Sequence, residues 1–322
     1  RKLALAASQA TSVTFAYCAN AYIEANEVSW RNAKHVAQWR TSLERYAFSV
    51  IGELAVRDIS ISHVLLILEP IWRSKTETAA RVRGRIEAVL DWATVRAYRS
   101  GDNPARWRGH LYKILPKPSK VKPVSHHEAL PINQVGAFFA QLRAQAGLAA
   151  RALEFAILTA TRSGEVRGAC WGEINLDDAV WTIPAARMKA GKEHRVPLSA
   201  AALALLRAMP RLGDSRLVFP SRKGSALSDM ALTAVMRRMN LDAVPHGFRS
   251  TFRDWCAEHT NFPREVAEMS LAHAIGDKVE AAYRRGDLFA KRRELMDAWA
   301  AYCDAATSDG TPTAADQDTN HP

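Results

Sequence analysis

Apolar side chains in the first third of the chain recur with the period of a helix. Between residues 78 and 97 they repeat at i, i+4, i+7 and i+8, on one face of an amphipathic helix: Val82, Ile86, Val89 and Leu90. The same pattern predicts helices at Phe15–Ile23 and Ala33–Tyr46, and another in "HVLLILEPIW" capped by Ser60 or Ser62. No strand pattern interrupts them, so residues 1–105 are predicted to form an all-α domain.

Beyond residue 127 the pattern changes from helical to mixed. Two short β-prone segments, at 179–184 and 194–198, flank nine residues that suit the loop of a β-hairpin. Helices are predicted around this hairpin at 132–146, 149–161, 199–208, 228–239, 247–259, 263–270, 277–284 and 288–303. The chain as a whole is therefore predicted to be mainly α with a small β-hairpin or sheet, which is an α+β fold.

A basic, proline-rich stretch separates the two patterns. Residues 106–127 contain no acidic residue and six basic ones: Arg106, Arg108, Lys113, Lys117, Lys120 and Lys122. Such a stretch is typical of an interdomain linker. It divides the 322 residues into a first domain at 1–105 and a second at 128–303, the number of domains expected for this length. Residues 304–322 carry four aspartates and no large apolar side chain, so they are predicted to form a disordered acidic tail.

Composition narrows the class of protein. The chain carries 44 Lys and Arg against 33 Asp and Glu, a formal net charge of +11, which favours a polyanion such as nucleic acid as partner. Its four cysteines are scattered without a C-x-x-C pair, which argues against a disulfide scaffold and a zinc ribbon. The sequence has no run of 18 apolar residues to predict a membrane span. The reducing cytoplasm is the expected compartment.

The second half holds a set of side chains whose types suit phosphate chemistry. In chain order they are Arg162, Glu165, Lys189, His246, Arg249, His273 and Tyr283. His246 and Arg249 are three residues apart and share a helical face, and Lys189 falls in the predicted hairpin loop. Each residue alone is ordinary, whereas their order along the chain is specific.

In this order the set resembles the active site of the tyrosine recombinases, the phage integrase family. The stretches "KTETAARVRGRIEAVLDWA", "NPARWRGHL", "MKAGKEHRVPLS" and "HGFRSTFRDW" are most similar to integrases of temperate phages and genomic islands. The likeness covers nearly the whole chain. It implies a core-binding, DNA-binding domain at 1–105 and a catalytic domain at 128–303. The N-terminal arm-binding domain that such integrases usually carry is expected to be absent from this chain.

The resemblance implies a role for each residue of the set. Tyr283 is expected to be the nucleophile that forms a 3′-phosphotyrosine bond, and Lys189 to protonate the leaving 5′ oxygen. Arg162 and Arg249 are expected to clamp the two non-bridging phosphate oxygens. His246 is the candidate base, and His273 fills the family's His or Trp position and donates a hydrogen bond to the phosphate. Glu165 is expected to orient Arg162 or His246.

Some alternatives remain open within this assignment. Lys192 is the nearest competitor of Lys189, and Tyr302 competes with Tyr283 in the second half of the chain. "ATRSGE" departs from the Gly and Leu that the family commonly has before the arginine, a change expected to affect packing rather than chemistry. The terminal helix at 288–303 packs either on its own domain or on a neighbouring subunit.

The expected function is site-specific recombination that integrates or excises a prophage or genomic island. No metal or other cofactor is expected, because the arginines supply the positive charge. The expected partners are duplex DNA attachment sites, an accessory bending or directionality protein, and three further protomers in a synaptic tetramer of a chain that is monomeric when free. The protein is therefore expected in the bacterial cytoplasm, associated with the nucleoid. Candidate DNA contacts outside the active site are Arg81, Arg83, Arg85 and the six basic residues of 106–127. A type IB topoisomerase-like enzyme and a non-enzymatic DNA-binding protein are the alternatives.

Overall fold

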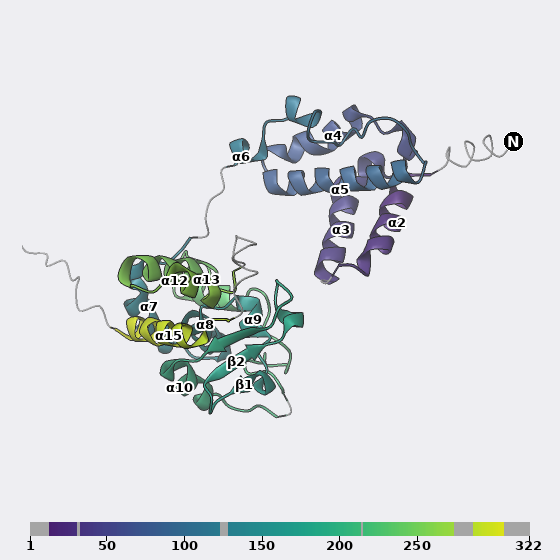
Figure 1. Ribbon diagram of the computed structural model, residues 1–322. Helices are drawn as coiled ribbons and strands as arrows, with labels where there is room; N and C mark the ends of the chain where they lie inside the picture. Colours follow the sequence, from purple (N-terminus) through teal and green to yellow (C-terminus); the bar gives the residue numbers. More distant parts are fainter. Residues whose placement is uncertain (1–12, 31–32, 123–127, 214, 274–285, 306–322) are drawn as a thin grey trace, which may run out of the picture. The chain divides into compact units, whose positions relative to one another are not determined.

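A computed structural model of the chain describes residues 13–30, 33–122, 128–213, 215–273 and 286–305. The chain divides into two compact units, residues 1–125 and 126–322, each with its own apolar core. Figure 1 shows the helical first unit and the mixed second unit. The α+β class expected from the pattern is confirmed, since a single small sheet accompanies the helices among the described residues.

The first unit is built around one long helix. Its α-helices are α2 (Phe15–Glu27), α3 (Ala33–Tyr46), α4 (Ile61–Trp72), α5 (Thr76–Val95) and α6 (Pro118–Val121). Shorter helical turns lie at Phe48–Gly52, Val56–Asp58 and Leu111–Lys113. The helix α5 packs against α2, α3 and α4 through the predicted apolar face, and α2 and α3 lie side by side (Figure 1). Ser60 caps α4 in a reciprocal pair with His63, which fixes the predicted start of that helix.

The basic stretch packs on the first unit over most of its length. Leu111 and Leu115 are buried in the core of the first unit, and the ring of Trp107 stacks on that of Trp72 with centroids 5.6 Å apart. The indole nitrogen of Trp72 also donates to the main-chain oxygen of Pro116 at 2.9 Å. The apolar residues interspersed among the cations therefore attach this stretch to the first unit as far as Val121. Residues 123–127 of the stretch lie outside the described residues.

The second unit surrounds a buried helix with other helices and the sheet. Its α-helices are α7 (Val135–Arg143), α8 (Leu148–Thr159), α9 (Ser163–Arg167), α10 (Ala200–Ala208), α11 (Ala231–Arg238), α12 (Gly247–His259), α13 (Arg264–Ser270) and α15 (Phe289–Asp304). Short 3-10 turns lie at Ile132–Gln134, Trp171–Glu173 and Ala185–Arg187. The helix α8 is buried along most of its length and packs against α7, α10, α11 and α15. The terminal helix α15 thus packs within its own unit, where the Trp299 indole donates to the Ile157 oxygen at 2.9 Å.

The sheet has three antiparallel strands in the order β1–β2–β3: β1 (Ile174–Asn175), β2 (Val180–Ile183) and β3 (His194–Pro197). The strands β2 and β3 form the predicted hairpin, with Trp181 opposite Val196 and both side chains buried. The two-residue strand β1 was not predicted, because two residues are too few for an alternating pattern to show. The helix expected at 277–284 and the tail from 306 lie outside the described residues. No helix among the residues described is long and apolar enough to span a membrane.

Candidate active site

The buried helix α8 delivers Arg162 to the edge of the second core. The helix ends at Thr159, and its C-cap Ala160 has a left-handed backbone (φ 49°) that turns the chain outward before Arg162 caps the short helix α9. The Glu165 carboxylate accepts from the Arg162 main-chain nitrogen at 2.8 Å and from its guanidinium Nη1 at 2.8 Å. Because Glu165 is 5% exposed, this ion pair fixes the guanidinium against the protein rather than in solvent.

Arg249 lies on the first turn of α12 and is 5% exposed. Its guanidinium donates to the main-chain oxygen of Ala160 and, at 2.5 Å, to that of Leu271. Burial lowers its pKa to about 10, helped by the charge of Arg162, while Glu165 acts in the other direction. The group remains charged at neutral pH, which makes it a cation held by carbonyls and suited to an anion.

His273 and the residue before it contact the two arginines. Its Nε2 lies 3.2 Å from Nη2 of Arg249, and its Nδ1 lies 2.7 Å from the carboxylate of Glu268 on α13. The preceding residue, Ala272, accepts from the Arg162 guanidinium at 3.5 Å. Residues from three separate parts of the chain therefore meet in one cluster: Arg162 with Glu165, Arg249, and Glu268 with His273.

The start of α12 is fixed by the first residues of the second unit. His246 occupies the N-cap position, is exposed, and precedes Gly247, at which a Cβ would lie 2.2 Å from the main-chain oxygen of Glu128. That oxygen accepts from the Val244 nitrogen at 3.2 Å. The side chain of Thr251 donates to the main-chain oxygen of Leu130 at 2.7 Å. Close contact with the chain entering the unit thus fixes where the first turn of α12, with His246 and Arg249, lies.

The two remaining predicted residues are Lys189 and Tyr283, and neither is part of these contacts as described. Lys189 is exposed in the loop between β2 and β3, directly after the buried Met188, and its competitor Lys192 is exposed in the same loop. Tyr283 lies outside the described residues. Its competitor Tyr302 packs against Trp299 with the rings 6.1 Å apart and donates to the Ile132 oxygen at 3.3 Å. These contacts give Tyr302 a packing role.

Three buried or half-buried titratable residues in or near the cluster were not identified from the sequence: His194, Glu268 and Arg292. His194 on β3 is 9% exposed, and burial, together with the nearby charge of Arg292, lowers its pKa to about 4. Arg292 on α15 is 2% exposed and donates to the main-chain oxygen of Arg195. The sequence held a signal for His194 and Arg292. His194 lies two residues before Val196 and therefore on the same inward face of the strand, and Arg292 shares the helical face of Leu295 and Met296. Glu268 has no such signal, because only the fold brings it to His273.

The departure at "ATRSGE" falls on a backbone carbonyl that contacts Arg249. Ala160 stands where the family commonly has glycine, and its φ of 49° lies in the left-handed region that glycine adopts without strain. Ala272 beside His273 has a φ of 48°. Each of these strained alanines offers its carbonyl to one of the two arginines. The backbone conformation at Ala160 thus positions an acceptor for Arg249, and the expectation that the departure affects packing rather than chemistry stays a prediction.

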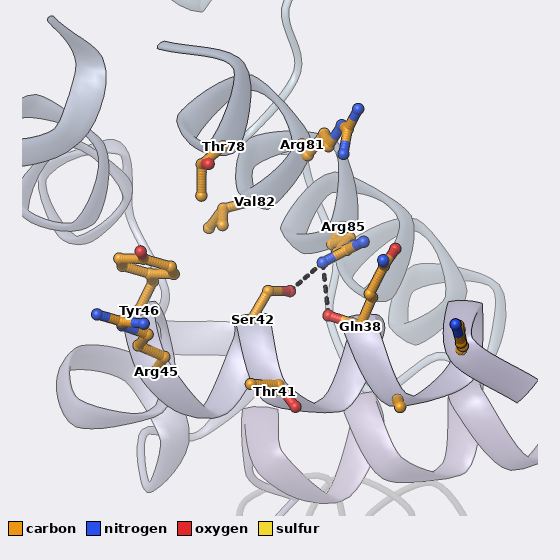
Figure 2. Close-up of a pocket in the computed structure, with 11 residues that line it drawn as sticks. Gln38, Thr41, Ser42, Arg45, Tyr46, Thr78, Arg81, Val82 and Arg85 are labelled. Carbon is orange, nitrogen blue, oxygen red and sulfur yellow. Dashed lines mark hydrogen bonds between the residues drawn. The ribbon is translucent and has the colours of Figure 1, made fainter. Parts of the chain in front are cut away.

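A cationic groove of about 450 Å³ lies between α3 and α5 of the first unit. Its lining includes four basic residues and no acidic one: Lys34, Arg45, Arg81 and Arg85. Figure 2 shows Arg85 reaching across to α3, where it donates to the Gln38 oxygen and the Ser42 hydroxyl. The side chain of Arg81 is 62% exposed and pairs with Glu77 one turn away. The groove therefore presents positive charge that is only loosely neutralised.

The other predicted DNA contacts divide into exposed and internal side chains. Arg83 points away from the groove, pairs with Glu87, donates to the Ala105 oxygen at 2.9 Å and lies over the ring of Trp107. Its side chain is 16% exposed, so it stabilises the first unit. The basic residues of the following stretch are all exposed: Arg106, Arg108, Lys113, Lys117, Lys120 and Lys122.

Within the described ranges, no group of three or more His, Cys, Asp or Glu side chains is arranged to hold a metal ion. The cluster contains the guanidinium groups of Arg162 and Arg249. Two arginines, a histidine and two supporting carboxylates can bind a tetrahedral oxyanion through fixed, charge-assisted donors.

Two family profiles match the chain. The profile described as phage integrase central domain matches residues 15–110, and that described as phage integrase family matches residues 128–287. The prophage integrase IntZ of Escherichia coli K12 is 30% identical over 281 residues, a match that covers 86% of this chain and 68% of IntZ.

The chain belongs to the phage integrase family. The resemblance to the phage integrase family, first seen in the order of the site residues, is thus confirmed. The prophage integrase IntA of the same organism is 33% identical, and the integrase of Enterobacteria phage P4 is 30% identical. These matches cover 84% and 81% of this chain but 65% and 63% of the relatives, so the chain spans somewhat less than two thirds of their length.

Solved structures share the family's fold. A lambda integrase dimer bound to a COC′ core site matches with a TM-score of 0.64 at 15% identity, covering 85% of this chain and 98% of that one. The integrase of transposon Tn1549 in complex with circular intermediate DNA matches with a TM-score of 0.59 at 13% identity, covering 85% and 100%. At this identity the likeness supports the fold.

Proposed function

We propose that the chain is a tyrosine-type site-specific recombinase that cleaves and rejoins duplex DNA through a 3′-phosphotyrosine intermediate. The observation that carries the proposal is the convergence of Arg162, Arg249 and His273 on one small volume, with carboxylates behind them. Membership of the phage integrase family supports it. The biological outcome would be integration or excision of a prophage or genomic island, at the nucleoid of a bacterial cell.

The proposed reaction conserves bond energy. The Tyr283 hydroxyl attacks the scissile phosphorus, the bond from phosphorus to the 5′ oxygen breaks, and a phosphodiester to tyrosine forms. His246 accepts the tyrosine proton, and Lys189 supplies a proton to the 5′ oxygen. Arg162 and Arg249 stabilise the charge that develops on the non-bridging oxygens, which is the contribution expected to be largest. The reverse attack by a 5′ hydroxyl of the partner strand rejoins the DNA.

The proposed substrate is duplex DNA carrying attachment sites, held by both units. The exposed cations of the groove and of residues 106–122 suit the phosphate backbone. Two DNA duplexes and four protomers would form the synaptic complex, from a chain that is monomeric when free, with an accessory protein bending DNA or setting direction. Lambda integrase, which shares the fold, has been captured as a dimer on a COC′ core site and as a tetramer on a Holliday junction.

Covalent capture of DNA tests the proposal. A nicked attachment-site duplex, in which the cleaved fragment diffuses away, should trap wild-type protein as a denaturant-resistant complex. The Tyr283→Phe variant should bind the site with unchanged affinity and trap none, while Tyr302→Phe should trap DNA as wild type does. Undiminished capture by Tyr283→Phe would overturn the nucleophile. Relaxation of supercoiled DNA without any attachment site would favour a topoisomerase, and inertness of the wild type would favour a binding protein.

A further inference from the structure

Glu268 lies directly behind His273, on the helix α13 that precedes it. We propose that Glu268 is a positioning residue for strand transfer, which fixes the ring of His273 and offsets the charge that this ring gains when it donates to the phosphate. The inference rests on the proposed function and adds to it a residue that the sequence set did not contain.

The Glu268 carboxylate is held in place on more than one side. One oxygen lies 2.7 Å from Nδ1 of His273, and the other accepts from Nε of Arg253 on α12 at 2.8 Å. The main-chain oxygen of Glu268 also accepts from the His273 nitrogen at 3.0 Å. With 21% of its side chain exposed, Glu268 has little freedom to turn away from the ring.

The second ring nitrogen establishes where the proton lies. Nε2 of His273 is 3.2 Å from Nη2 of Arg249. A guanidinium has donors and no acceptor, so Nε2 must accept from it, and the proton of the neutral ring must be on Nδ1, facing Glu268. In this form His273 presents no N–H to an incoming phosphate oxygen.

Donation to phosphate therefore requires a second proton on the ring. His273 is 39% exposed along its side chain, so water can deliver that proton to Nε2 as the phosphate draws the Arg249 donor toward itself. The ring then carries one positive charge and two N–H groups, with Nδ1–H directed to Glu268 and Nε2–H to the phosphate. No bond between heavy atoms forms or breaks in this step.

The charges around the ring explain why a carboxylate is needed there. The charged groups that face this corner from the described elements are Arg249 and Arg253 of α12, Glu268 and Arg264 of α13, and Arg162 with Glu165 beside α9. The arginines oppose a further cation, and Glu268 is the carboxylate in contact with the ring. Burial acts to raise the Glu268 pKa, but hydrogen bonds from Arg253 and His273 outweigh it and leave the pKa lowered, so the group is ionised at neutral pH.

The test compares Glu268→Ala and Glu268→Gln with wild type in the full chain. Covalent capture on the nicked attachment site should slow about 100-fold in the alanine variant, the upper end of the range observed when the partner behind a metal-binding histidine is removed. Glutamine can accept from Nδ1–H but carries no charge, so it should restore the ring orientation and slow capture about 10-fold. The matched control is Glu258→Ala, which removes an exposed carboxylate from α12.

The number of protons on the ring supplies a readout independent of activity. In a ¹⁵N spectrum of protein that carries Tyr283→Phe and is bound to the attachment site, the His273 imidazole should carry protons on both nitrogens, and adding Glu268→Ala should reduce this doubly protonated population. Wild-type capture rates in both Glu268 variants, or an equally protonated ring in the DNA-bound Glu268→Ala protein, would overturn the proposal. If Glu268→Ala does not fold, the glutamine variant decides by its capture rate. If wild type captures no DNA at all, the recombinase assignment fails, whereas the protonation of the ring in DNA-bound protein still tests the role of Glu268.

Discussion

The two units of the chain use arginine in different ways. In the first unit, Arg81 and Arg85 line an open groove, and each keeps a bond to its own unit, to a carboxylate or to a turn of α3. In the second unit, Arg249 and Arg292 are almost fully buried and held by main-chain carbonyls. The proposed function accounts for this difference: a groove that followed a DNA backbone would tolerate several side-chain positions, whereas a site that stabilised one reacting phosphate would need its donors fixed beforehand.

Exchanging arginine for lysine should reveal the largest difference between the buried arginine of the second unit and the groove arginine of the first. Arg249→Lys keeps the charge but loses the planar fork that spans the Ala160 and Leu271 carbonyls, and it should lower the rate of covalent capture by about 100-fold or more. The matched exchange in the groove, Arg85→Lys, should change that rate less than about threefold. Rates measured with saturating DNA check this, and equal effects of the two exchanges would abolish the distinction.

Acid should destabilise the second unit through His194. The folded-state pKa of this histidine is about 4, below the ordinary value of 6.5, so between these values the unfolded chain binds more protons than the folded one. The contribution of His194 to the free energy of unfolding is complete above pH 6.5. As the pH falls toward 4 this contribution is lost, which lowers the free energy of unfolding by at most about 3 kcal/mol.

Unfolding of wild type and His194→Gln in denaturant, measured at several pH values, isolates this histidine from other titrating groups. Glutamine does not titrate, so the fall in unfolding free energy between pH 6.5 and 4 should be smaller in the variant. Parallel curves for the two proteins would show that His194 does not remain neutral in the folded state.

Removal of charge from the groove should weaken DNA binding in a salt-dependent manner. Arg81→Ala should weaken binding by about tenfold or less at moderate salt and reduce the slope of log affinity against log salt by about one. Arg83→Ala, which removes an internal ion pair on the same helix, should instead lower the stability of the first unit with little change in that slope. Titrations at three salt concentrations distinguish them, and identical slopes for Arg81→Ala and wild type would remove the groove from the interface.

The smallest expected effect concerns the strained backbone beside Arg162. Ala160→Gly relieves a left-handed alanine, worth about 1 kcal/mol, but adds freedom to the unfolded chain, so it should raise the free energy of unfolding by about 0.5 kcal/mol. The control is Ala156→Gly in the middle of α8, which should lower it by about 1 kcal/mol. Destabilisation by both substitutions would show that the conformation at Ala160 is not strained.

Much of the fold could be predicted because the apolar periods are long. The face of α5 and the pair β2 and β3 follow directly from spacing, and the start of α4 follows from its serine cap. The stretch from 106 was harder, because charge dominates its composition while Trp107 and Leu111 attach it to a core. Local pattern shows whether a side chain is polar, but only packing decides whether an apolar one in a basic stretch is buried.

The candidate site divides in the same way. Arg162, Arg249 and His273 could be chosen from residue type and order, and the structure brings them together. The roles assigned to them remain predictions, as does that of Tyr283. Glu268 could not be chosen, since a glutamate on an amphipathic helix has the appearance of any solvated residue until the fold places α13 against His273.

Gly247 carries no side chain, yet it sets the register of the site. Only a hydrogen fits between the first turn of α12 and the Glu128 carbonyl, because a Cβ would lie 2.2 Å from that oxygen. A survey of all single substitutions, scored by recombination, should therefore rank position 247 with the reacting residues. Small and large replacements at position 247 should abolish recombination equally, because every one of them adds a Cβ. In a packed core, by contrast, the loss grows with the change in side-chain size. Position 247 would then be essential for function although glycine has no side chain that could take part in the reaction.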